Sequence, residues 1–141
     1  PVNKFLGDGA LAVFGAPNEL ADHAGAALNA AVLIQRLVIE RFGGELRIGI
    51  GINTGKVIAG TIGGGSKLEF TLIGDTVNVA ARVEQLTKTT GDAILLTGRC
   101  VDALNHRPAA LTDRGFHTLK GKSSAVHLFG LDLVRHQIRL R

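Results

Sequence analysis

Asn78 and Arg82 stand four residues apart in a stretch, 75–88, that is predicted to be a helix following an apolar strand at 68–73. A spacing of four places both side chains on one helix face. An amide and a guanidinium there could together orient a hydroxyl and meet the negative charge of a phosphate. An ordinary polar face on an amphipathic helix is the alternative.

Asp8 lies in a Gly-Asp-Gly segment between apolar runs at 2–6 and 10–15, which predicts a β-hairpin with Asp8 at its tip. A carboxylate in that position could hold a metal ion. Aspartate is also common in turns for backbone reasons alone, so both interpretations stay open. Lys4, on the first strand, is either a ligand-facing cation or a solvated edge residue.

Four segments of the chain resemble the catalytic domain of the class III nucleotidyl cyclases, the adenylate and guanylate cyclases. They occur in the order found in that family and span nearly the whole sequence. The segments are 4–8, 49–60, 70–82 and 119–122. Any one of them would be weak evidence, whereas four in order are specific, and the variant most resembled is a bacterial adenylate cyclase.

The resemblance implies that the ribose 3′-hydroxyl of ATP attacks the α-phosphate, which yields cyclic AMP and pyrophosphate. Two divalent ions, Mg²⁺ or Mn²⁺, would assist, with Asp8 as a metal ligand. Asn78 would hold the ribose and Arg82 would stabilise the growing negative charge, as the two catalytic residues. Lys120 would bind the terminal phosphates. Lys56 matches less closely a basic residue of the family that contacts pyrophosphate. For both lysines a solvent-exposed charge at a strand end is the alternative.

Lys4 and Thr71 occupy the two base-reading positions of the family that the chain resembles. Adenine presents an amino donor and a ring-nitrogen acceptor, so a cationic donor paired with a hydroxyl acceptor suits it. Lysine at the first position is typical of the adenylate cyclases, whereas the guanylate cyclases carry glutamate. Threonine is a weaker acceptor than the usual aspartate, so we expect ATP preference with imperfect discrimination. The alternative for Thr71 is simple strand propensity.

Each active site of the family is shared between two chains, so the resemblance implies a homodimer. Asp8 of one subunit would face Asn78 and Arg82 of the other. A catalytically inactive cyclase-fold domain that binds nucleotide or merely dimerises remains the alternative function. The sequence contains neither a Walker lysine pattern nor a dinucleotide-binding glycine pattern.

The 141 residues, 45% hydrophobic and 20% charged, predict a single domain over 1–141. Alternating strands and helices indicate the α+β class, with helices packed on one face of a mostly antiparallel sheet. The resemblance implies a ferredoxin-like core. It also implies a first strand and a further metal-binding aspartate ahead of Pro1, so we expect the domain to be incomplete at its N-terminus and weak or inactive alone.

Other elements follow from periodicity and turn residues. Asp22 is expected to cap a helix that runs to about Phe42 and is ended by Gly43 and Gly44. The candidates for its buried face are Ala24, Ala27, Leu28, Ala31, Leu33, Val38 and Ile39. Asp75 is expected to cap the helix at 75–88. The remaining elements are strands at 45–53, 56–62, 93–97, 115–119 and 125–131, and a short helix at 98–104.

The net charge of +4 does not by itself indicate a nucleic-acid partner, because the charge is dispersed and the only aromatic residues are six Phe. The single cysteine, Cys100, is expected to be a small core residue rather than a nucleophile. No apolar run is long enough to cross a bilayer, so we expect no membrane contact by this segment. We expect a cytoplasmic location, with an anchor elsewhere in the parent protein left open.

Overall fold

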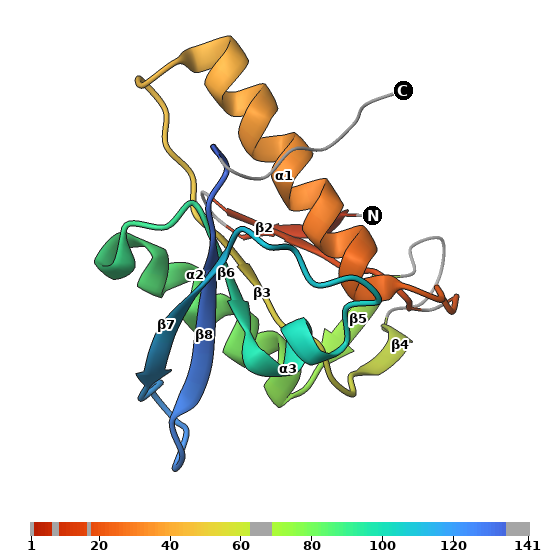
Figure 1. The fold of residues 1–141 in the computed structure, drawn as a ribbon. Coiled ribbons are helices and arrows are strands. Elements are labelled where there is room, and N and C mark those ends of the chain that lie inside the picture. The colour runs from red at the N-terminus through yellow and green to blue at the C-terminus, as the bar shows by residue number, and fades with distance from the viewer. Residues whose placement is uncertain (1, 7–8, 17, 63–68, 135–141) are drawn as a thin grey trace.

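The computed structural model describes residues 2–6, 9–16, 18–62 and 69–134, and within 2–6, 58–62 and 69–73 it describes the backbone only. Figure 1 shows the elements in chain order. They are β1 (Val2–Leu6), β2 (Gly9–Ala12), α1 (His23–Phe42), β3 (Ile50–Ile52), β4 (Ile58–Ile62), β5 (Glu69–Ile73), α2 (Asp75–Thr90), β6 (Ile94–Thr97), α3 (Gly98–Asp102), β7 (Leu111–His117) and β8 (Val126–Leu131).

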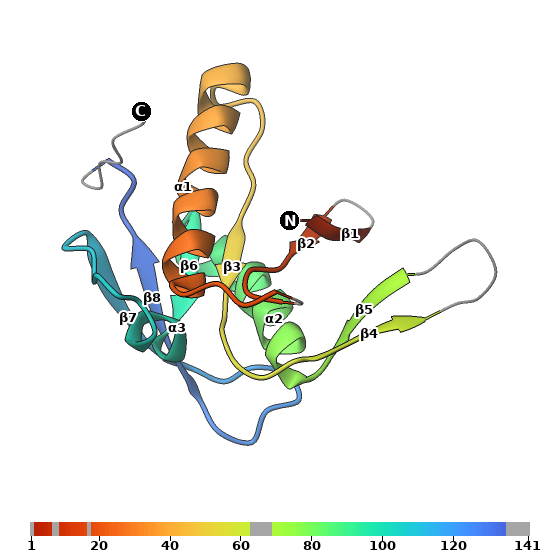
Figure 2. The same cartoon turned by 90° about the vertical axis from the view of Figure 1, so that its right-hand side faces the viewer.

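A four-stranded sheet in the order β3-β6-β8-β7 organises the domain. The β3–β6 pair is parallel, with Ile52 opposite Leu96, whereas β6–β8 and β7–β8 are antiparallel. Two antiparallel hairpins, β1–β2 and β4–β5, form separate two-stranded sheets among the described residues. Figure 2 shows the β4–β5 hairpin projecting from the body of the domain.

Helices cover both faces of the four-stranded sheet. Ile94 and Leu96 of β6 pack in one core with α1 and α3, whereas Leu95, between them, packs in a second core with α2. Because successive strand residues point to opposite faces, a strand buried along its whole length needs cover on both. The α+β class and the largely antiparallel pairing are confirmed, but the helices lie on two faces rather than on the expected one.

Helix α1 has the ends expected from the sequence. The Asp22 carboxylate accepts from the backbone N–H of Gly25 at 3.1 Å, and Gly43, with φ of 59°, follows the last turn. The expected core residues Ala24, Leu28 and Ala31 are buried, and Ala27 packs against them; the unexpected residues Val32 and Gln35 are buried as well. Leu33 and Val38 are half-buried.

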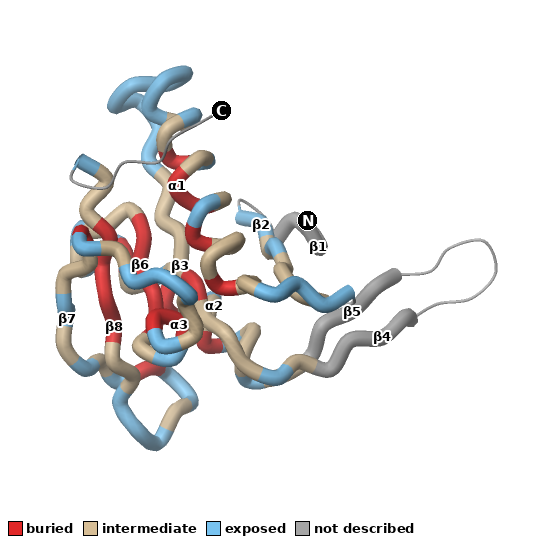
Figure 3. The backbone as a smooth tube through the Cα atoms, turned by 45° about the vertical axis from the view of Figure 1, so that its right-hand side comes forward, coloured by how far each residue is buried: buried red, intermediate tan, exposed pale blue. Residues whose placement is uncertain are grey.

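Ile39, expected in the core, is 56% exposed, so that prediction is wrong. It lies on the same helical face as Val32, but the expected strand at 45–53 is reduced to Ile50–Ile52. The C-terminal end of α1 therefore extends past the sheet, as the exposed end of that helix in Figure 3 shows. Helical periodicity identified the face but could not show how far the sheet beneath it reaches.

Helix α2 lies directly against β3. Val79, Val83 and Thr87, spaced by four residues, form its buried stripe. A Cβ on Gly51 would lie 2.4 Å from the backbone nitrogen of Glu84, so only glycine permits this approach. Asp75 is the first helical residue rather than the expected cap, since Gly74 occupies the N-cap without a side-chain hydrogen bond.

Cys100 is fully buried in the middle of α3, as expected of a small core residue. Burial raises the pKa of its thiol to about 12, so the nucleophilic thiolate is disfavoured at neutral pH. Within the described ranges, every helix is too short or too polar to cross a bilayer.

Candidate active site

The polar face of α2 carries Asn78 and Arg82 next to its buried stripe. Val79 and Val83, each one residue further along, hold the helix against the core at 6% and 0% exposure. Asn78 is exposed and Arg82 is half-buried. The accessible face of α2 therefore lies directly beside the face that packs in the core. Because α2 is anchored in this way, it holds the backbone of Asn78 and Arg82 at fixed positions on a rigid element.

The segment between β7 and β8 brings two lysines to this face. Leu119, only 3% exposed, anchors the segment in the core beside α2. A turn follows, in which the N–H of Lys122 donates to the carbonyl of Leu119 at 3.0 Å and Gly121 adopts φ of 85°. Lys122 Nζ then lies 2.6 Å from Asp75 Oδ2 in the first turn of α2.

A cavity of about 190 Å³ lies between α2 and this segment. Its lining residues are Asp75, Asn78, Val79, Arg82, Lys120, Gly121 and Lys122. The structure thus brings together three of the predicted site residues, from two elements about forty positions apart. The volume is below the roughly 300–1,000 Å³ typical of sites that enclose a whole small molecule, so it suits part of a nucleotide.

The charge of this cavity favours an anion. Three cations, Arg82, Lys120 and Lys122, face one carboxylate, Asp75. Among the described residues, the buried Nε of Arg82 has no hydrogen-bond partner, so one N–H donor of this cavity-lining side chain is unsatisfied. Phosphate oxygens supply the acceptors that such donors require.

The described residues do not form a metal site by themselves. No group of three or more His, Cys, Asp or Glu side chains among them could hold one. The single carboxylate of the cavity, Asp75, is already paired with Lys122. Asp8, the metal ligand expected from the resemblance, lies outside the described residues.

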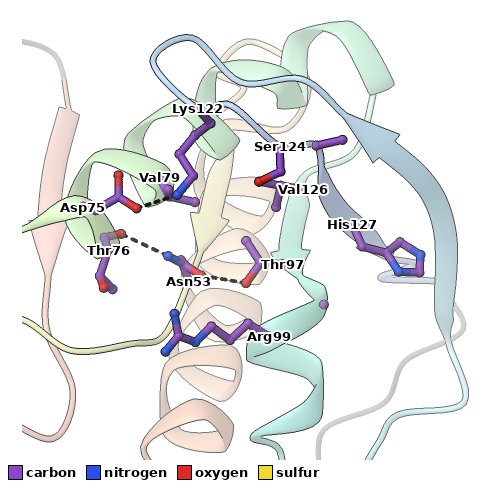
Figure 4. A pocket seen from close by; sticks show the side chains of 12 residues that line it. Asn53, Asp75, Thr76, Val79, Thr97, Arg99, Lys122, Ser124, Val126 and His127 are labelled. Atoms are coloured by element: carbon purple, nitrogen blue, oxygen red, sulfur yellow. Dashed lines mark hydrogen bonds and ion pairs between the residues drawn. The ribbon is translucent and has the colours of Figure 1, made fainter.

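A second cavity, of about 280 Å³, adjoins the first and shares Asp75, Val79 and Lys122 with it. Figure 4 shows its lining side chains, which come from the carboxyl ends of β3 and β6, the first turn of α2, the start of α3 and the approach to β8. The Asp75–Lys122 ion pair therefore forms a wall common to both cavities.

Three further predicted residues lie on other elements. In the strand register, Lys4 of β1 lies opposite Leu11 of β2, and Thr71 of β5 lies opposite Gly60 of β4. For Lys4 and Thr71 the structure describes the backbone only. Lys56 is exposed between β3 and β4 and lines neither cavity. The structure therefore does not place Lys56 with Asn78, Arg82 and Lys120.

Asp75 and Lys122 line the site but were not predicted to belong to it. From sequence, an acidic residue in the first turn of a helix is interpreted as a cap or as a favourable interaction with the helix dipole. That local role gives no indication of a partner elsewhere in the chain. The Lys-Gly-Lys spacing at 120–122 was the available signal. A glycine in the left-handed region between two lysines allows both to face one surface.

Comparison with known proteins identifies the domain. Residues 3–132 match the model of the adenylate and guanylate cyclase catalytic domain. The uncharacterized protein Rv1318c of Mycobacterium tuberculosis is 41% identical over 129 residues, which are 90% of this chain and 24% of that protein. The chain thus spans about a quarter of this curated relative.

Solved structures agree in fold. A bacterial light-regulated adenylyl cyclase is 26% identical with a TM-score of 0.75, over 95% of this chain and 39% of that one. The guanylate cyclase domain of RhGC from Catenaria anguillulae, in complex with GTP, is 29% identical with a TM-score of 0.77, over 93% and 71%. Because the family model matches residues 3–132, nearly the whole of this chain, the chain belongs to the adenylate and guanylate cyclase catalytic domain family.

Proposed function

We propose that this domain converts ATP to 3′,5′-cyclic AMP and pyrophosphate, in cytoplasmic cyclic-nucleotide signalling. Membership of the cyclase family supports a nucleotidyl cyclase. The observation that carries the proposal is the single cavity in which Asn78, Arg82 and Lys120 meet. An amide, a guanidinium and an ammonium in one cationic recess match what a bound ribose and polyphosphate require.

The reaction depends mainly on positioning and on neutralising charge. The 3′-oxygen of the ribose forms a bond to the α-phosphorus and its proton is released to solvent, while the bond from that phosphorus to the oxygen bridging to the β-phosphate breaks. Asn78 orients the ribose so that the hydroxyl lies in line with the leaving oxygen. Arg82 donates to the charge that grows on the α-phosphate, and Lys120 holds the terminal phosphates that depart as pyrophosphate.

Dependence on two divalent ions, Mg²⁺ or Mn²⁺, is part of the proposal and rests on family membership. Such ions would neutralise phosphate charge. Asp8 is the ligand that the sequence offers for them. The roles proposed for Asn78, Arg82 and Lys120 do not depend on which residues hold the ions. A homodimer with shared sites is also proposed, and this part likewise rests on family membership.

The preference for ATP over GTP rests on Lys4 and Thr71. Similar solved structures include both an adenylyl cyclase and a guanylate cyclase bound to GTP, so the family itself leaves the base open. A Lys4→Glu, Thr71→Cys double substitution should move preference toward GTP. Unchanged selectivity would refute the base-reading role of this pair.

The test uses the full-length protein that contains this domain, incubated with ATP or GTP and Mn²⁺ or Mg²⁺, with cyclic products measured. We expect cyclic AMP, and its loss on Asp8→Ala and on Arg82→Ala. Lys88→Ala, an exposed cation in the last turn of α2, is the matched control and should retain activity. ATP binding without product in either metal would overturn the catalytic proposal and favour the inactive regulatory domain.

A further inference from the structure

The first turn of α2, which carries Asn78, is held from outside the helix. The N-cap is Gly74, which makes no side-chain hydrogen bond, and the N–H of Asn78 reaches the carbonyl of Gly74 at 3.4 Å. A helix start of this kind has little local support of its own. What fixes its position must therefore come from neighbouring elements.

Asn53 supplies that support. It follows β3, and its side-chain Nδ2 donates to the carbonyl of Thr76 at 3.1 Å, two residues before Asn78. Its Oδ1 accepts from the hydroxyl of Thr97 at 2.7 Å, at the end of the neighbouring strand β6. Figure 4 shows this chain of bonds from Thr97 through Asn53 to Thr76.

The far end of the chain is anchored in the core. Thr97 is 2% exposed, and its hydroxyl oxygen accepts from the backbone N–H of Cys100 at 3.2 Å. The carbonyl of Thr76 can only accept, so Asn53 must present its NH₂ group, rather than its oxygen, to α2. The amide oxygen then faces Thr97, whose hydroxyl donates to it.

A second bond holds the same turn. The hydroxyl of Thr76 donates to the carbonyl of Lys56 at 2.7 Å. A Cβ on Gly55 would lie 2.6 Å from that hydroxyl, so the chain passes close enough only because residue 55 has no side chain. Thr76 is therefore held at its carbonyl and at its hydroxyl by the segment 53–56.

We propose that Asn53 is a positioning residue for the reaction: through its two-sided amide it ties the start of α2 to the carboxyl ends of β3 and β6, and so sets where Asn78 meets the ribose. This inference rests on the proposed function. The amide is required because the position needs one acceptor and one donor. Aspartate has no donor for the carbonyl of Thr76, and leucine has neither group.

The chain contains a matched control. Gln35, 4% exposed, also donates through a side-chain amide to backbone carbonyls, those of Ile48 and Ala93, at 2.9 Å each. These carbonyls lie at the opposite, amino ends of the same two strands. Loss of either amide removes two side-chain hydrogen bonds, but only loss of Asn53 releases α2.

The experiment compares Asn53→Leu with Gln35→Leu in the full-length protein. We expect both to lower the melting temperature. Asn53→Leu should lower kcat about 10- to 100-fold with KM changed about twofold or less, the size expected when a reacting group is misplaced. Gln35→Leu should leave kcat within about twofold once folded protein is counted.

Thr97→Val is a second variant that leaves Asn53 in place and should reproduce the loss of kcat, with Thr97→Ser restoring it. Amide hydrogen exchange at 78–82, where the helical hydrogen bonds begin, should accelerate in Asn53→Leu and not in Gln35→Leu. An equal fall in kcat in both, or unchanged exchange at 78–82, overturns the positioning role. If the unaltered protein makes no cyclic nucleotide, the proposed function fails, while the exchange measurement still decides whether Asn53 holds α2.

Discussion

Lys122 Nζ lies 2.6 Å from Asp75 Oδ2, and this pair links the segment that carries Lys120 to the helix that carries Asn78 and Arg82. Both members of the pair line both cavities. The link matters because, apart from the buried Leu119, the segment around Lys120 is largely exposed, so the ion pair adds a second contact with α2. The pair is thus placed to affect substrate binding more than stability.

A double-mutant cycle with Asp75→Asn and Lys122→Met tests this. The Asp75 side chain is 66% exposed and that of Lys122 is 31% exposed, so the coupling in unfolding free energy should be only about 0.5 kcal/mol. It should shrink as salt is added. Lys122→Met should nevertheless raise KM for the nucleotide severalfold. Equal KM values in Lys122→Met and the unaltered protein would contradict the link.

Arg82→Met should separate activity from stability. The substitution removes a buried Nε that has no partner among the described residues, and an unsatisfied buried donor costs about 1–3 kcal/mol. The unfolding free energy should therefore stay constant or rise, while the rate falls ~100- to 1000-fold. Thermal melts and turnover assays on the same preparation measure both.

Val83→Ala is the contrasting variant on the same helix. Val83 is fully buried, so its truncation leaves a cavity and lowers the melting temperature. The rate per folded molecule should fall far less than in Arg82→Met. A large loss of stability in Arg82→Met would show that its guanidinium is a structural group.

Gly51→Ala should displace α2. The added Cβ would meet the backbone nitrogen of Glu84 at 2.4 Å and the carbonyl oxygen of Ala80 at 2.8 Å, and backbone atoms cannot rotate away. Overpacking of this kind costs about 1–3 kcal/mol, and the shift of α2 should also lower kcat. Gly44→Ala, where nothing lies within 4 Å, is the control and should change neither quantity.

Asp113 should make the stability of the β7–β8 hairpin depend on acidity. The backbone N–H of Gly115 and then His127 hold the pKa of its carboxyl below the ordinary value of 3.8. A lowered folded-state pKa stabilises the protein above the unfolded value, and that contribution is lost as pH falls through the folded value. The melting temperature should therefore drop below about pH 4.

Asp113→Asn should flatten this part of the pH profile, while Asp102→Asn, an exposed residue of α3, should leave it unchanged. The His127 ring is stacked on Phe116 at 4.3 Å and tilted against Phe129 at 4.4 Å, centroid to centroid, so we expect the hairpin to retain its aromatic packing in the variant. Identical low-pH profiles for Asp113→Asn and the unaltered protein would refute the assignment.

Features that depend on neighbouring residues followed from the sequence. Four-residue spacing put Asn78 and Arg82 on one helix face, and Asp22 and Gly43 marked the ends of α1, because helix geometry and caps are local properties. The order of the four family segments likewise sufficed to identify the domain.

Tertiary structure alone decided which distant groups meet. The pairing of Asp75 with Lys122, the bond from Asn53 to Thr97 and the exposure of Ile39 depend on where strands end and how helices cross them. Local periodicity says which way a side chain faces, but not what lies opposite it. Contacts between segments tens of residues apart are set by the packing of both cores, and no short stretch of sequence contains that information.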